Sequence, residues 1–215
     1  MKYPKVHSEF DTLATLRKGY SIARLGDGEF KMIDGKGYVR EPPNPELSDE
    51  LRSVLTNPHP RCIVGIPTMN PNGPKVENWQ RHEERFLRML SPAVEYYSAF
   101  ISRPDSAPWI RTQRFAKLYQ SLWLDKRVVV ICERKGSAFR AVRIGSRSAV
   151  HVECPTEQAY AVIDALEAAA LQPRPDIVIL SCGPTATCLA NRLAARGVQA
   201  IDFGSGGSFI VRLLE

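Results

Sequence analysis

Short apolar runs alternate with amphipathic stretches through the second half of the chain, and this alternation constrains the fold more than any other feature. The runs at 127–132 (RVVVIC), 149–153, 176–181 (DIVILS) and 198–203 (VQAIDF) have the length and branched side chains of buried strands. Helical patterns separate the later runs, one from Thr156 to residue 171 and one at 185–196 that ends at Gly197. Such alternation predicts a mostly parallel sheet with helices on both faces, a Rossmann-like α/β architecture.

The first half of the chain has the same elements in a less regular order. Ser8 and Asp11 open a helix that runs to Gly19, and strands are expected at 20–25 and 62–66. Ser48, followed by two acids, predicts the start of a second helix. Further helices are expected at 78–90, 91–100 and 110–124, with loops at 35–45 and 67–74. No stretch is fit to divide two domains, so we expect a single domain over 1–215 with an irregular middle.

Composition places the chain among ordinary globular proteins. Hydrophobic residues make up 44% and charged residues 24% of it. No apolar run approaches the roughly 20 residues that span a bilayer, and the N-terminus has no apolar segment typical of a secretory signal. The five cysteines are scattered and contain no CxxC pair, which favours reduced thiols. We therefore expect a cytoplasmic protein without a transmembrane segment.

The net charge of +6 attracts polyanions, which include nucleic acids, acidic membranes and phosphate-bearing substrates. The basic residues are spread along the chain rather than gathered in one run, and this pattern favours solvated surface charge. We therefore expect no nucleic-acid partner. A non-enzymatic module that binds an acidic partner stays open as an alternative, and its affinity would fall steeply with salt.

The end of the first strand carries two acids in the segment Arg24-Leu25-Gly26-Asp27-Gly28-Glu29. If the segment is extended, the carboxylates of Asp27 and Glu29 project to the same side and repel each other unless a cation lies between them. Oxygen donors of this kind suit Mg²⁺ or Mn²⁺. Gly26 and Gly28 would let a ligand approach closely, and Arg24 could contact a phosphate. The same letters also fit a plain turn followed by a helix with Glu29 in its first turn.

Two further strand ends have the residues of an anion site. Gly183, Pro184 and Thr185 join a strand to a helix, where free N–H groups and a hydroxyl could bind phosphate. Gly136 and Ser137 follow the RVVVIC strand among basic residues and could hold a phosphate or a ribose. Both segments also fit ligand-free connections. The segment at Gly183 lacks the lysine of a P-loop, so ATP hydrolysis is not indicated.

Other polar residues are weaker candidates. Asp202 ends the last strand before a glycine run, and Arg103 and Arg111 could clamp phosphate, although most arginines are surface charge. The chain contains neither the G-x-S-x-G nor the G-x-G-x-x-G motif, so hydrolase and dinucleotide-binding functions lose support.

The segment 21–30 (SIARLGDGEF) resembles the opening signature of the bacterial GT-D-fold glycosyltransferases, which reads roughly R-[FL]-G-D-G-E. The resemblance continues in order along the chain. Its later pieces are individually weaker and lie at 62–67, 100–104 (FISRP), 128–139, 181–189 and 200–204.

The resemblance implies a Rossmann-like GT-D-type domain that transfers a hexose from a nucleotide-sugar, typically a UDP-hexose, to a glycan or other hydroxyl acceptor. It implies that Asp27 and Glu29 bind Mn²⁺ or Mg²⁺. The family often has a histidine after the closing Asp-x-Gly, where this chain has Ser205. That difference leaves the role of the position open, and a homodimer is an open alternative to a monomer. A metal-assisted phosphohydrolase or nucleotidyl transferase would use the same acids and remains the alternative activity.

Overall fold

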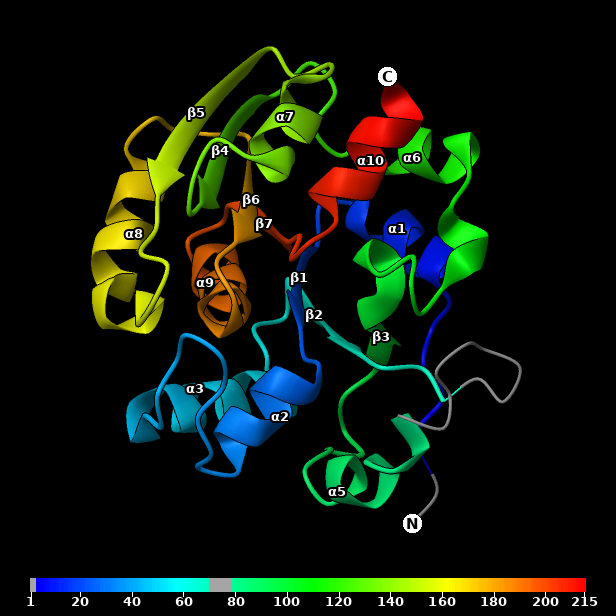
Figure 1. Cartoon of the computed structure of the whole chain (residues 1–215), viewed down its shortest axis with the longest axis vertical. Helices are drawn as coiled ribbons and strands as arrows, with labels where there is room; N and C mark the ends of the chain where they lie inside the picture. Colours follow the sequence, from blue (N-terminus) through cyan, green and yellow to red (C-terminus); the bar gives the residue numbers. More distant parts are fainter. Residues whose placement is uncertain (1–2, 70–78) are drawn as a thin grey trace.

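The described strands form one parallel sheet with the order β3-β2-β1-β7-β6-β4-β5 (Figure 1). The structure is a computed structural model that describes residues 3–69 and 79–215. The predicted Rossmann-like architecture is therefore confirmed, and the sheet is wholly parallel within these residues. The strands are β1 (Ser21–Arg24), β2 (Cys62–Ile66), β3 (Tyr96–Ser98), β4 (Arg127–Cys132), β5 (Ser148–Glu153), β6 (Ile177–Ser181) and β7 (Gln199–Asp202).

Helices cover both faces of this sheet (Figure 1). One face carries α3 (Pro45–Thr56), α8 (Ile163–Leu171) and α9 (Pro184–Ala195), and α2 (Asp27–Ile33) packs on α3. The opposite face carries α1 (Glu9–Leu16), α6 (Gln113–Gln120), α7 (Ser137–Arg143) and α10 (Gly207–Leu214). The remaining elements are α5 (Glu83–Leu87) and the short 3₁₀ helices η1 (Ala99–Ser102), η2 (Pro108–Ile110) and η3 (Ala159–Val162).

The core explains why the apolar runs were good predictors of strands. Side chains from 128–131 and 177–180 are almost entirely buried, because a sheet covered on both faces buries every residue of its central strands. On the face of the sheet that α6 covers, the rings of Tyr119, Trp123 and Phe203 pack against one another. The sheet is therefore a rigid base for the loops that leave its carboxyl edge.

At two places in the sheet, the connections from the carboxyl ends of neighbouring strands leave in opposite directions, and we call these the reversal points. β4 leads outward to β5, whereas its neighbour β6 leads the other way across the sheet to β7. From β1 the chain enters α2 on one side of the sheet, whereas from the neighbouring β7 it enters α10 on the opposite face. In open α/β sheets, ligands bind in the crevice beyond the carboxyl ends of the strands at such points. The fold therefore offers two adjacent ligand-binding positions.

Several local predictions are wrong. The second helix starts at Pro45 rather than at Ser48, because the Asn44 side chain accepts a hydrogen bond from the Leu47 amide and proline fits the first helical position. Residues 91–100 do not form a helix; they include strand β3, which pairs with β2. Thr156 does not cap a helix, since η3 starts only at 159.

Other predicted boundaries changed less. The helix expected at 110–124 is the shorter α6, and the terminal helix α10 was not predicted at all. The helix predicted at 78–90 begins outside the described residues, and residues 70–74 of the predicted 67–74 loop also lie outside them. Among the described residues, no helix is both long and apolar enough to cross a membrane.

Candidate functional site

Three adjoining depressions lie at the carboxyl edge of the sheet. The first, called here the carboxylate pocket, lies beyond β1 and β7 and contains Asp27 and Glu29. The second, the serine pocket, lies beyond β4 and β6, and the third, the turn pocket, lies beside it. Gly183 lines all three, so they form one continuous cleft over both reversal points. Predicted site residues from four strand ends therefore meet in one place.

The two acids of the first motif lie at the start of helix α2. Asp27 is its first residue, and its carboxylate is partly exposed and lies 3.3 Å from the ammonium group of Lys31. Glu29 turns back, and its Oε2 accepts a hydrogen bond of 2.8 Å from the Gly26 amide. The two acids were expected to project together from an extended segment, and that premise is wrong because the segment is helical. Both carboxylates nevertheless line the same pocket.

The environment of Glu29 is unusual for an acid. Burial raises its pKa to about 7, and the nearby Asp202 raises it as well, while the hydrogen bond from Gly26 lowers it. Burial penalises the charged form of a carboxyl group, so a nearby cation would restore that charge. No group of three or more histidine, cysteine or acidic side chains able to hold a metal occurs in the part of the chain that the structure describes. The carboxylate pocket thus offers at most two acids to a cation.

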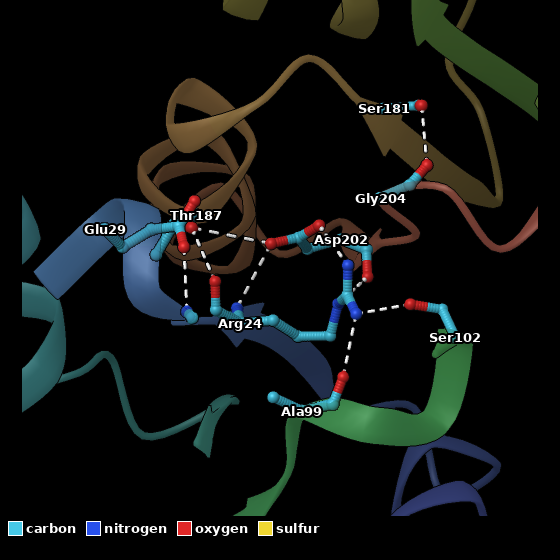
Figure 2. Close-up of polar contacts among 9 residues, drawn as sticks. Arg24, Glu29, Ala99, Ser102, Ser181, Thr187, Asp202 and Gly204 are labelled. Atoms are coloured by element: carbon cyan, nitrogen blue, oxygen red, sulfur yellow. Dashed lines mark hydrogen bonds and ion pairs between the residues drawn. The ribbon is translucent and has the colours of Figure 1, made fainter. Parts of the chain in front are cut away.

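Arg24 is the centre of a hydrogen-bond network beside the carboxylate pocket. Its Nε donates to the Asp202 carbonyl at 2.7 Å, and its Nη2 lies 3.2 Å from Oδ1 of the same residue. Its Nη1 donates to the Ala99 carbonyl at 2.8 Å and to the Ser102 hydroxyl (Figure 2). All three guanidinium nitrogens thus have partners within the protein, and the phosphate contact expected of Arg24 stays a prediction. Arg24 joins the ends of β1 and β7 to η1.

Asp202 is the buried partner in this network. Its Oδ2 accepts hydrogen bonds from the Arg24 amide at 3.2 Å and from the Thr187 hydroxyl at 3.4 Å (Figure 2). Burial raises the pKa of Asp202, and Arg24 lowers it. Asp202 lines the carboxylate pocket, but its oxygens already have protein partners. Its evident role in the structure is to fix Arg24.

The rest of the carboxylate pocket contains a cation and an aromatic end. Arg103 makes a bidentate pair with Asp105, 3.0 Å for both bonds, and remains 40% exposed. That pairing raises the pKa of Arg103, and Asp27 contributes to the same effect. Gly28 packs against the ring of Tyr38, and Pro67, Trp79 and Phe100 close the apolar end. Arg111 does not line any of the three depressions.

The serine pocket combines hydroxyl groups with the starts of three helices. It is lined by Gly136, Ser137, Ser181, Gly183, Ser205 and Ser208, together with Arg40, Glu133 and Arg134. The N-cap residues of α7, α9 and α10 are all glycines that have no side chain to cap the helix. The first N–H groups of a helix have no intrahelical partners, and here no N-cap side chain satisfies them either. This part of the cleft suits an anion.

Thr185 does not face the cleft as expected. Its side chain is fully buried, and its hydroxyl lies 3.3 Å from Oε1 of Glu41. An acid from the chain itself therefore occupies the place where a ligand anion was predicted. Pro184 lines the turn pocket, and Gly183, with φ of +60°, remains in the cleft.

Several residues of the cleft were not predicted as site residues from the sequence, and Tyr38 and Trp79 are the two aromatic residues in whose case the signal can be named. Tyr38 lay in a segment read only as a glycine- and proline-rich loop, where a lone aromatic residue was the available signal. Trp79 lies in the stretch expected to form a helix at 78–90, yet it lines the carboxylate pocket. Neither residue lies directly at one of the four strand ends.

Comparisons with known proteins agree with this geometry. The family model described as glycosyltransferase GT-D fold matches residues 22–208. The probable glycosyl transferase Gly of Streptococcus gordonii is 31% identical over 206 residues, which are 88% of this chain and 30% of that protein. The glycosyltransferase GlyD of Streptococcus pneumoniae is 25% identical over 203 residues, 86% of this chain and 24% of that protein. The chain thus spans less than a third of the length of these relatives.

Solved structures give the same result at the level of the fold. A glycosyltransferase from Streptococcus sanguinis has a TM-score of 0.82 at 26% identity, covering 95% of this chain and 83% of that one. A highly conserved domain with a distinct glycosyltransferase fold has a TM-score of 0.82 at 24% identity, covering 95% of this chain and 79% of its own. Because the family model spans most of the residues, this chain belongs to the GT-D-fold glycosyltransferase family.

Proposed function

We propose that this chain transfers a hexose from a nucleotide-sugar, a UDP-hexose, to a hydroxyl group of a glycan or other acceptor, with Mn²⁺ or Mg²⁺ held by Asp27 and Glu29. The observation that carries the proposal is the meeting of both acids with Arg103, Gly183 and Ser205 in one cleft. The reversal points of the sheet lie directly beneath it.

The two acids fit a cation of this kind. Mg²⁺-type ions take one or two carboxylates and complete their shell with water and substrate phosphate oxygens. Among the residues that the structure describes, Asp27 forms an ion pair with the partly exposed Lys31, and surface pairs of that kind are weak. Glu29 uses one carboxylate oxygen to accept a hydrogen bond from the Gly26 amide. A bound cation would supply positive charge against the leaving diphosphate.

The rest of the cleft supports the binding of a nucleoside diphosphate. The uncapped helix starts at Gly136 and Gly183 offer N–H groups, and Ser137 offers a hydroxyl, for phosphate or ribose oxygens. Arg103 lines the same pocket as the two acids and would stabilise negative charge as the sugar departs. Arg24 and Asp202 hold the surrounding loops in place, and Gly26 and Gly28 leave room beside the acids.

We further propose that the domain acts in the cytoplasm, since its five cysteines are unpaired and buried. Assembly as a homodimer stays a proposal that sedimentation of the purified chain would test.

Calorimetry of the native chain with UDP and Mn²⁺ tests the proposed function. We expect binding that EDTA abolishes and that Asp27→Ala weakens by more than tenfold. Glu84→Ala on the exposed first turn of α5 is the control and should bind as the native chain does. Absence of binding by the native chain would exclude the proposal, and release of free phosphate from phosphorylated substrates without a sugar acceptor would favour the phosphohydrolase alternative. An affinity that EDTA does not change but that decreases steeply as the salt concentration rises would favour a non-enzymatic anion-binding module.

A further inference from the structure

Tyr38 occupies a fixed position between two parts of the cleft. It lines both the carboxylate pocket and the turn pocket. The backbone of Tyr38 pairs with Glu41 through hydrogen bonds of 2.8 and 2.9 Å in a tight turn whose Arg40 has φ of +71°. This turn bridges the segment after α2 to the opposite wall of the cleft.

Contacts on that wall anchor the turn. The Arg40 guanidinium lies 3.0 Å from the Glu133 carboxylate, and the Arg40 carbonyl accepts a hydrogen bond of 2.8 Å from the Gln158 amide. Glu41 is buried against Thr185. The turn is thus tied to β4, η3 and α9, and Tyr38 is not a side chain on a free loop.

The ring of Tyr38 is held from two sides. A methyl group at Gly28 would lie 2.9 Å from Cε1 of the ring, so the ring rests on the backbone of α2. The ammonium group of Lys31 lies 5.7 Å from the ring centroid. The residue nevertheless stays 37% exposed. Its hydroxyl has no hydrogen-bond partner within residues 3–69 and 79–215.

Burial, more than the surrounding charges, keeps this hydroxyl protonated. Burial raises the pKa of Tyr38, Asp27 and Glu29 raise it further, and Arg103 lowers it. The phenol is therefore a neutral donor that lies among the two acids and the arginine. A donor of this kind next to a cation site is suited to an anionic oxygen that the cation attracts.

We infer that the Tyr38 hydroxyl binds the donor directly, by a hydrogen bond to a phosphate oxygen of its diphosphate. The inference rests on the proposed function, since it takes the diphosphate to lie beside Asp27. It adds a ligand-binding residue that comes from a turn rather than from a strand end. The rigid support of the ring means that the hydroxyl is in place before the ligand arrives.

The test compares the native chain with Tyr38→Phe, which keeps the ring and removes only the hydroxyl. Calorimetry with Mn²⁺ measures the affinity for two probes, UDP and inorganic pyrophosphate. We expect both affinities to fall about tenfold, which corresponds to about 1.4 kcal/mol, with an unchanged melting temperature in the absence of ligand. Tyr97→Phe is the matched control, because that hydroxyl donates to Glu95 at 3.2 Å outside the cleft; it should leave both affinities unchanged.

Three outcomes decide the matter. Equal affinities of the native chain and Tyr38→Phe for both probes would overturn the inference alone. Loss for UDP without loss for pyrophosphate would also overturn it, because the contact would then be to the nucleoside. Failure of the native chain to bind either probe would overturn the proposed function and the inference together.

Discussion

Replacement of Glu29 by glutamine should make the free energy of unfolding less dependent on pH. Burial raises the pKa of Glu29 to about 7, compared with 4.5 for an ordinary glutamate. A carboxyl group with a raised pKa keeps its proton in the folded chain after the unfolded chain has lost it. The free energy of unfolding therefore falls as pH rises from about 4.5 to about 7, and the loss is complete above that window.

The size of the effect follows from the same two values. At about 1.4 kcal/mol for each tenfold change in proton affinity, the interval between them corresponds to about 3 kcal/mol. Glu29→Gln is always neutral, and its amide oxygen can still accept the hydrogen bond from Gly26. We expect the native chain and the variant to be similar in stability near pH 4.5, and the variant to be about 3 kcal/mol more stable above pH 7.5.

Urea denaturation in EDTA, followed by circular dichroism at several pH values, measures this difference. All other titrating groups cancel between the two proteins, so only the divergence of the curves matters. The exposed Glu84→Gln is the control, and its curve should run parallel to that of the native chain. Addition of Mn²⁺ with UDP should recover stability in the native chain above pH 7 and not in Glu29→Gln. Parallel curves for the native chain and Glu29→Gln in EDTA would refute the argument from burial.

Three further changes have expected outcomes. Arg24→Met leaves the buried Asp202 carboxylate without its ion-pair partner and should lower the free energy of unfolding by about 3 kcal/mol, measured by urea denaturation. A loss below about 1 kcal/mol would contradict the network in Figure 2. Gly207→Ala forces a methyl group into the backbone of Ala138 at the α7–α10 contact and should lower stability by about 2 kcal/mol, seen as a lower melting temperature; an unchanged value would show that the contact yields freely. Arg103→Ala removes a half-exposed ion pair with Asp105, so the free energy of unfolding should change by less than about 1 kcal/mol. Calorimetry with Mn²⁺ should show the affinity for UDP falling about tenfold. An affinity equal to that of the native chain would show that Arg103 does not bind the donor.

The sequence predicted the fold where burial alone decides structure. The runs at 127–132 and 176–181 are central strands, whose uniform apolarity follows from coverage on both faces. Strand β3 was missed because its three residues, Tyr96 to Ser98, are too short and too mixed in polarity to differ from a helix face. Helix α10 was missed because the glycines at 204–207 suggested only a flexible run, although they allow α10 to pack directly on α7.

The candidate site was predicted in position more than in detail. Gly26, Asp27 and Gly183 meet in the cleft because parallel strands bring their carboxyl ends to one edge. The partner of Arg24 could not be read from the sequence, since Asp202 lies 178 residues away along the chain. Thr185 is likewise satisfied by a distant acid, Glu41. Tertiary partners of this kind decide whether a polar side chain is free to bind a ligand.

The most direct test of the proposed metal site is a crystal of the chain grown with Mn²⁺ and UDP and measured at the manganese absorption edge. We predict an anomalous peak within about 2.0–2.6 Å of a carboxylate oxygen of Asp27, with Glu29 as the second protein ligand and diphosphate oxygens completing the shell. A nucleotide bound in the cleft with no manganese peak beside Asp27, or a peak held only by other residues, would contradict this prediction.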